Sequence, residues 1–251
     1  MTPLSRKQRE IRERDELIRD VARRMLLERG YLGLTMDRIA KEIEYSKGTV
    51  YQHFRSKEDL VVALATETAH KRAELFERAS LFRGRPRERL WAVGIAYELF
   101  VRLYPAHFHS ERLIHAASIR EKAAERRDEI LEDCEERCGQ VVAGILRDAI
   151  AAGDLELPSG EDGTPQSAVM GLSFNLWALS FGSFFLISTG APLIRKGVAD
   201  PLAALRRGYE RILDGYGMRP LTNEWDYDAT LERVRNEVFP EESRRLAELG
   251  G

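Results

Sequence analysis

Apolar residues recur at intervals of three and four along most of this 251-residue sequence, and that spacing limits the fold more than any other feature. Between Arg9 and Arg29 they form one apolar stripe on a helix, and Gly30 supplies a stop. No stretch of useful length alternates apolar and polar residues as a half-buried strand would, and the sequence shows no internal repeat. We therefore expect an all-α protein.

Caps and breakers divide the rest of the chain into further helices. Thr35, Ser46 and Ser56 are suited to cap helices, because their short side-chain oxygens accept hydrogen bonds from the free N–H groups at a helix start. Proline and glycine mark several of the ends. The expected helices span residues 36–43, 47–54, 57–79, 87–104, 107–119, 122–152, 166–189 and 201–216, and two weaker helical patterns follow Gly217.

Composition is that of a soluble globular protein, with 43% hydrophobic and 32% charged residues. Charge is uneven: through Ser56 there are 13 Lys and Arg against 9 Asp and Glu, so the N-terminal quarter is positive and the remainder negative. No apolar secretory segment follows Met1, and there are only two cysteines, Cys134 and Cys138. We therefore expect a cytoplasmic protein.

Two short helices joined at "IEYSK", residues 43–47, predict a helix-turn-helix. The wider string "GYLGLTMDRIAKEIEYSKGTVYQHFRSKEDL", residues 30–60, resembles the DNA-binding segment of the TetR family of bacterial transcriptional regulators. The residues that match in type and spacing are Gly30, Tyr31, Thr35, Ile39, Ala40, Ser46, Gly48, Tyr51, His53, Phe54, Lys57, Glu58 and Leu60. One departure is Glu44, where such proteins usually carry Gly. If Glu44 must take a positive φ, it bears strain of about 1 kcal/mol or more.

The resemblance implies that helix 47–54 enters the major groove of operator DNA, N-terminus first. On that basis the expected phosphate contacts are Thr35, Ser46, Tyr51, His53 and Lys57, and the expected base contacts are Lys47, Thr49 and Gln52. Gly48 lacks a Cβ and would let the backbone approach DNA closely. Alternatives remain for two of these residues: Tyr51 as a cover for the small core, and His53 as a ring that bonds the backbone.

The resemblance also implies a domain plan. Residues 1–60 would form the DNA-binding domain with its basic arm, and residues 61–216 a helical effector-binding and dimerisation domain. Residues 217–251 lie beyond what the resemblance covers and would form an extension that either braces the dimer or is loose. Helix 87–104 is apolar almost all round, so it either fills a core or lines a cavity. A pocket there would suit a hydrophobic or aromatic small molecule. Its expected walls are Trp91, Tyr97, Phe100, Tyr104, Phe108, Asn175, Trp177, Phe181 and Phe184.

No charged residue lies between Thr164 and Ile194. That length would span a bilayer, but Gln166, Asn175 and several serines speak against a membrane segment, and there is no aromatic belt at both ends. We expect one face of this helix to pack on its own domain and the other on a second copy of the chain. The resemblance implies a homodimer joined through residues 166–189 and 201–216, which would match a palindromic operator.

Two clusters suggest other functions. The segment "HFHSERLIH" brings together His107, His109, Glu111 and His115, and a metal-dependent enzyme using this cluster is the competing class. Cys134 and Cys138 are one helical turn apart and are either inert thiols or a redox switch. No nucleophile motif or phosphate loop is present in the sequence, so we expect no catalytic residues, no metal and no cofactor. The resulting hypothesis is a ligand-responsive transcriptional repressor, and a DNA-binding protein without an effector is a third possibility.

Overall fold

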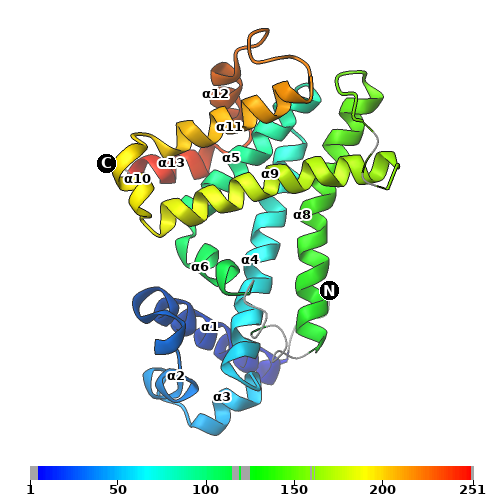
Figure 1. The fold of residues 1–251 in the computed structure, drawn as a ribbon. Coiled ribbons are helices and arrows are strands. Elements are labelled where there is room, and N and C mark those ends of the chain that lie inside the picture. Colours follow the sequence, from blue (N-terminus) through cyan, green and yellow to red (C-terminus); the bar gives the residue numbers. More distant parts are fainter. Residues whose placement is uncertain (1–4, 115–118, 120–124, 159, 161, 250–251) are drawn as a thin grey trace. The chain divides into compact units, whose positions relative to one another are not determined.

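The computed structural model describes the chain except for residues 1–4, 115–118, 120–124, 159, 161 and 250–251. Every regular element in the described residues is an α-helix, which confirms the all-α prediction (Figure 1). The helices are α1 Arg6–Gly33, α2 Met36–Glu42, α3 Lys47–His53, α4 Lys57–Ser80, α5 Pro86–Leu103, α6 Pro105–Ile114, α8 Glu125–Ala151, α9 Pro165–Ser188, α10 Pro192–Gly197, α11 Pro201–Gly215, α12 Tyr227–Glu237 and α13 Pro240–Leu249.

Three hydroxyl side chains start helices as the sequence predicts. Each accepts a hydrogen bond at 3.1–3.2 Å from the N–H group three residues further on: Thr35 from Arg38, Ser46 from Thr49, and Ser56 from Asp59. The predicted stop at Gly30 is a break, because this residue has a φ of 65° inside α1. Helix 107–119 can be followed only to Ile114, and its remaining residues lie largely outside the described ones.

The chain forms two compact units. The first comprises Met1–Lys71 and Tyr104–Glu135, and the second Arg72–Leu103 and Glu136–Gly251. Helices α4 and α8 each contribute residues to both. The functional division at residues 60 and 216 stays a prediction.

In the first unit, α1, α2, α3 and the start of α4 enclose one apolar core. The predicted stripe of α1 is buried from Ile18 to Leu26, and Ile39 and Ala40 of α2 are buried against it. Val50 and Phe54 anchor the end of the helix-turn-helix, since both are fully buried. The two short helices and their turn are thus held by apolar packing.

The turn between α2 and α3 contains Glu44, the residue for which the sequence raised the question of a positive φ. Glu44 has a φ of 58°, in the left-handed region that favours glycine. The Tyr45 N–H donates to the Ala40 carbonyl at 3.0 Å, and the Glu44 N–H donates to the Lys41 carbonyl at 3.4 Å. These two bonds form a Schellman motif, which normally carries Gly at the position of Glu44. Glu44 therefore bears the strain that its Cβ causes there.

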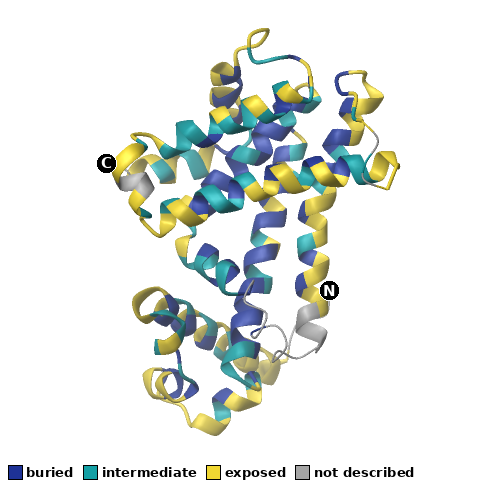
Figure 2. Cartoon of the chain, viewed as in Figure 1, coloured by how far each residue is buried: buried dark blue, intermediate teal, exposed yellow. Residues whose placement is uncertain are grey.

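In the second unit, α5 is buried along nearly its whole length, and α9 and α11 pack on each other (Figures 1 and 2). The residues after 216 are not loose where the structure describes them, since α12 and α13 pack on α5. Tyr227 of α12 stacks on Trp91 of α5, with ring centroids 5.4 Å apart. Arg78 of α4 donates to both carboxylate oxygens of Glu242 in α13, at 2.6 and 3.2 Å.

A fully buried arginine of α5 joins the end of α11 to the residues that follow it. Arg87 donates to the Met218 carbonyl at 2.6 Å and to the Thr222 hydroxyl at 3.0 Å, and it pairs with Asp214 at 2.6 Å. Its guanidinium also lies 4.9 Å from the ring centroid of Tyr227. A buried charge is tolerated only where such partners surround it. The extension therefore forms part of the packing of the second unit.

We predict that Glu44→Gly raises the stability of the first unit by about 1 kcal/mol, because glycine adopts a φ near 60° without a Cβ clash. The matched control is Lys41→Gly, an exposed residue inside α2, which should lower stability by about 0.5–1 kcal/mol. Native-state hydrogen exchange of the α2 and α3 amides measures both changes. Equal losses for the two variants would show that Glu44 is unstrained.

Candidate nucleic-acid interface

Helix α3 has one side in the core and the other in solvent. Val50 and Phe54, four residues apart, are fully buried, whereas Tyr51 is 43% exposed and Gln52 is also exposed. The dense polar residues of the sequence therefore lie on an outward surface. The exposed position of Tyr51 does not fit the alternative in which its ring covers the small core.

The hydroxyl groups of Ser46 and Thr49 lie at the start of α3 and contact each other, with their oxygens 2.8 Å apart. The Ser46 oxygen also accepts from the Thr49 N–H, so Ser46 is first of all a helix cap. Thr35 has the same place at the start of α2. The two helix starts thus carry three of the expected DNA contacts, each ordered by local hydrogen bonds.

Tyr31 and the Lys57-Glu58 pair, which lie at opposite ends of the sequence motif, are in contact in the structure. The Tyr31 hydroxyl donates to Glu58 at 2.7 Å, and the Lys57 ammonium lies 4.0 Å from the Tyr31 ring centroid. Burial, together with the bond to Glu58, raises the pKa of Tyr31 well above its usual value. These contacts fix the start of α4, directly after α3, against the end of α1.

His53 differs from the other expected DNA contacts, because its side chain is only 8% exposed. Its Nδ1 lies 3.6 Å from the Asp15 carboxylate of α1, and Asp15 also accepts from Arg19 at 2.5 Å. The ring therefore faces α1. The sequence suggested a backbone bond as the alternative to a phosphate contact, and the structure supplies a carboxylate neighbour.

Sequence reasoning missed Asp37, which lies beside the first residue of α3. The Lys47 ammonium is 2.7 Å from Asp37 Oδ1 and 2.9 Å from Oδ2, so it contacts both carboxylate oxygens. The hydrogen bond to Asp37 raises the pKa of Lys47, which is therefore charged at neutral pH. The pair could have been predicted from the helix-turn-helix, because that motif places the first turn of α2, with Asp37, next to Lys47, the first residue of α3.

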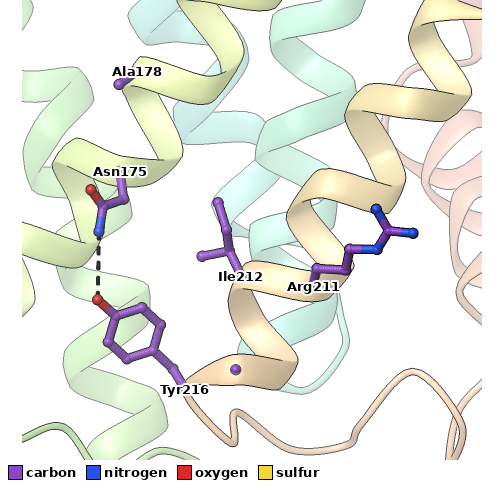
Figure 3. A pocket seen from close by; sticks show the side chains of 6 residues that line it. Asn175, Ala178, Arg211, Ile212 and Tyr216 are labelled. Carbon is purple, nitrogen blue, oxygen red and sulfur yellow. Dashed lines mark hydrogen bonds between the residues drawn. The ribbon is translucent and has the colours of Figure 1, made fainter.

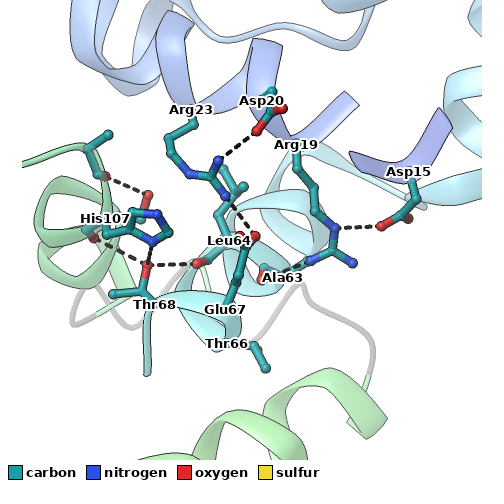
Figure 4. A network of polar contacts seen from close by, with 12 residues as sticks. Asp15, Arg19, Asp20, Arg23, Ala63, Leu64, Thr66, Glu67, Thr68 and His107 are labelled. Atoms are coloured by element: carbon teal, nitrogen blue, oxygen red, sulfur yellow. Dashed lines mark hydrogen bonds and ion pairs between the residues drawn. The ribbon is translucent and has the colours of Figure 1, made fainter. Parts of the chain in front are cut away.

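A polar network ties α1 to α4 and α6 within the first unit (Figure 4). Arg19 donates to the Ala63 carbonyl at 3.2 Å, and Arg23 donates to Glu67 at 2.7 Å. Thr68 donates its hydroxyl hydrogen to the Leu64 carbonyl at 2.8 Å, so it accepts from His107 Nδ1 at 3.0 Å. Burial first, and then the nearby cations, lower the pKa of His107 to about 4.

The histidine segment does not form a metal centre in the part of the chain that the structure describes, where no group of three His, Cys, Asp or Glu side chains is suitably placed. His107 bonds Thr68, while His109 Nδ1 lies 2.7 Å from Arg112, so the two rings have different partners. Glu111 is buried, and His115 lies outside the described residues. This arrangement does not favour the metal-dependent enzyme.

The expected effector walls fall into different environments. Tyr97 contacts the rings of Phe76, Phe100 and Phe184, with centroids 5.3–6.1 Å apart. Trp91 instead stacks on Tyr227. Trp177 and Phe181 stack along α9 at 5.6 Å. Tyr104 and Phe108 belong to the first unit and the other expected walls to the second.

Asn175 lines an open pocket of about 400 Å³ between α9 and α11 (Figure 3). Its side-chain amide donates to the Tyr216 hydroxyl at 3.5 Å across one edge of this pocket. Arg211 and Ile212 of α11 and Ala178 of α9 complete most of the lining. Asn175 is therefore separate from the aromatic cluster around Tyr97.

Comparison with known proteins supports the helix-turn-helix. The family profile described as "Bacterial regulatory proteins, tetR family" matches residues 18–64. The HTH-type transcriptional repressor AcnR of Corynebacterium diphtheriae is 39% identical over 66 residues, which are 26% of this chain and 35% of that protein. The repressor Rv1474c of Mycobacterium tuberculosis is 39% identical over 64 residues, 26% of this chain and 34% of that protein. The chain thus spans about a third of the length of the curated relatives it matches.

Similarity to solved structures extends over more of the chain. A tetR-family regulatory protein from Rhodococcus RHA1 superposes with a TM-score of 0.61 and 20% identity, over 81% of this chain and 97% of that protein. The architecture is thus a helix-turn-helix followed by a helical domain. Residues 18–64 therefore resemble the DNA-binding segment of the TetR family of bacterial regulatory proteins, and the similarity of fold extends over most of the chain.

Gly48 provides a test of close approach to DNA. An added Cβ would meet only Ser46 Oγ, at 3.7 Å, so the fold itself does not require glycine there. We predict that Gly48→Ala raises the stability of the first unit by about 0.5–1 kcal/mol and weakens DNA binding. Hydrogen exchange and fluorescence anisotropy measure the two effects. Gly139→Ala, on an open part of α8, is the control that should leave DNA affinity unchanged. Unchanged affinity of Gly48→Ala would refute the close approach.

Proposed function

We propose that this protein is a transcriptional repressor that binds a palindromic operator as a homodimer and is released by a small hydrophobic or aromatic effector. The observation that carries the proposal is the two-sided helix α3. Its apolar side is buried in a TetR-type domain, and Lys47, Tyr51 and Gln52 are left on its exposed side. Such a helix presents both phosphate-binding and base-reading groups.

In this proposal, phosphate and base contacts have separate roles. Thr35, Ser46, Tyr51 and Lys57 position the domain on the DNA backbone. Gln52 has an amide that can pair with adenine, while Lys47 can reach the acceptors of guanine. Thr49 stands next to them, and Gly48 allows the approach. His53 faces Asp15 of α1, so its first role is to hold the end of α3 in place. A phosphate contact is its second role.

The homodimer is proposed on the exposed surface of α9. Phe174 is 60% exposed, and Met170 and Leu186 are also exposed, so the helix presents a broad apolar surface. By length and composition α9 is also long and apolar enough to cross a membrane, which is weak evidence alone. Its packing on α11, so close that a Cβ added at Gly208 would lie 3.1 Å from Leu179, supports an interface made by these two helices.

The effector is proposed to bind among the aromatic side chains of the second unit. The rings around Tyr97 provide an apolar surface, and the Tyr209 ring, whose hydroxyl pairs with Ser180, lies where it would contact a Cβ added at Gly94 of α5. Burial raises the pKa of Tyr209 to about 12, so this hydroxyl stays neutral. Such a site suits an apolar ligand with one hydroxyl or carbonyl group. A true effector must weaken operator binding by the factor by which operator weakens effector binding.

The proposed class of protein also has consequences for location, catalysis and domain organisation. We infer a cytoplasmic regulator without catalytic activity, metal or cofactor. The DNA-binding part would be residues 1–60 and the effector and dimer part residues 61–216. The extension 217–251 would brace α11, since Arg87 connects α11 to Met218 and Thr222. A DNA-binding protein without an effector would show no reciprocal coupling.

The proposed function is tested by selecting a binding sequence from random duplex DNA and measuring variants on it by anisotropy. We predict that Gln52→Ala loses discrimination at one base pair per half-site, by roughly 1–3 kcal/mol. Lys57→Ala should weaken all sequences alike and reduce the salt slope by about one per half-site. No selected sequence at all would overturn the function. An unchanged ranking of operator variants by Gln52→Ala would remove its base-reading role.

The dimer is tested with a charge on the exposed side of α9. We predict that Phe174→Glu shifts the chain to monomers and weakens dimerisation by roughly 3 kcal/mol or more, because an unpaired charge would be buried. Leu81→Glu changes an exposed apolar residue outside α9 and is the matched control. Sedimentation without detergent measures both. A monomeric wild-type chain at micromolar concentration would contradict the proposed interface.

A further inference from the structure

An ion pair between Lys47 and Asp37 lies on the exposed surface of the helix-turn-helix, and Asp37 has no role in the proposed function. Its two charged groups come from different helices, Asp37 from the first turn of α2 and Lys47 from the first residue of α3. The ammonium lies within 2.9 Å of both carboxylate oxygens. Yet the side chains are 57% and 64% exposed, so the pair lies open to a partner.

An acidic side chain on such a surface requires an explanation. Ion pairs as exposed as this one are weak, so Lys47 can leave Asp37 when another anion competes for it. If a DNA phosphate takes Lys47, the Asp37 carboxylate is left without its cation in the negative field of DNA. Asp37 therefore opposes binding wherever DNA offers only phosphate.

One kind of base pair would remove this penalty. The major-groove edge of a G·C pair presents the guanine acceptors N7 and O6 next to the cytosine N4 amino donor. The Lys47 ammonium is a donor and the Asp37 carboxylate an acceptor. Their separation of 2.7 Å resembles that of guanine O6 and cytosine N4, which are joined by an ordinary hydrogen bond of about 2.9 Å. Both partners of the ion pair can thus be satisfied without being separated.

We propose that Asp37 and Lys47 act as one unit that reads a G·C base pair in each operator half-site, with Lys47 donating to guanine and Asp37 accepting from cytosine. Asp37 is then a specificity-determining residue, because it makes the contribution of Lys47 conditional on the base pair. This inference rests on the proposed function. It goes further by naming a base pair and the acidic residue that selects it.

Glu42 offers a matched control. It is a second exposed acid of α2, and it pairs with Arg24 of α1 instead of with α3. Removing Glu42 changes the charge of the same helix by the same amount. Any general electrostatic effect of Asp37 should therefore appear in Glu42→Ala as well.

The experiment uses the full chain and its selected operator. Wild-type, Asp37→Ala, Lys47→Ala, the double variant and Glu42→Ala are measured on operators carrying all four base pairs at each position. We expect a G·C preference of about 5- to 100-fold at one symmetric position in the wild type. Asp37→Ala should lose most of it and bind non-operator DNA more tightly. Its salt slope should also be steeper by about one per half-site, because Lys47 is free to bind phosphate.

The double variant tests whether the two residues act together. If they do, Lys47→Ala loses the preference at the same position as Asp37→Ala, and the double variant loses no more than either single variant. Glu42→Ala should keep the preference. Equal strengthening of binding to all sequences by Asp37→Ala and Glu42→Ala, or losses at different positions for Asp37 and Lys47, would overturn the inference alone. Failure to select any DNA would overturn the proposed function and the inference with it.

Discussion

The burial of Val50 and Phe54 sets the orientation of α3, on which the exposed surface of the first unit depends. Burying side chains of this size contributes roughly 1.5–3 kcal/mol each. Because they lie four residues apart, they occupy one side of the helix and fix its rotation. Any other rotation would expose them and bury the polar groups of Lys47 and Gln52. The position of the exposed groups is thus a consequence of core packing.

Many residues of the family motif serve this packing and do not themselves face outward. Tyr31 and Glu58 share a hydrogen bond that holds α1 to α4, and Lys57 lies over the same ring. His53 faces Asp15 on α1. These side chains hold both ends of the helix-turn-helix in place. A resemblance in sequence therefore contains scaffold residues and contact residues together, and only the structure separates them.

Local signals predicted most of the fold. Caps act over three residues, and breakers act on their own backbone, so Thr35, Ser46 and Gly30 could be interpreted without knowledge of the tertiary structure. The positive φ of Glu44 was raised as a question only by the family resemblance, in which Gly is usual at that place, and the structure shows it. Helix α10 was not predicted, and its N-cap Ala191 makes no side-chain cap bond that would have signalled its start.

Contacts between distant residues were not predictable in the same way. The partners of Arg87 lie more than 120 residues further along the chain, and the stacking of Trp91 on Tyr227 depends on where α12 packs. A sequence pattern identifies Trp91 as apolar but does not choose between a pocket wall and a packing contact. The candidate site shows the same limit, since the polar surface of α3 was predicted, whereas the pairing of Lys47 with Asp37 was not.

The size of α3 connects DNA reading to assembly. A seven-residue helix with two or three base-reading side chains distinguishes few base pairs, so one copy would select its site poorly. Linking two copies makes the second contact intramolecular, at an effective concentration that is commonly millimolar. Each half-site can then bind weakly while the pair binds tightly and selects twice as many positions. In the proposed dimer, the apolar surface of α9 would therefore be as important for specificity as α3 itself, because without a dimer the few proposed readers of α3 would not define an operator.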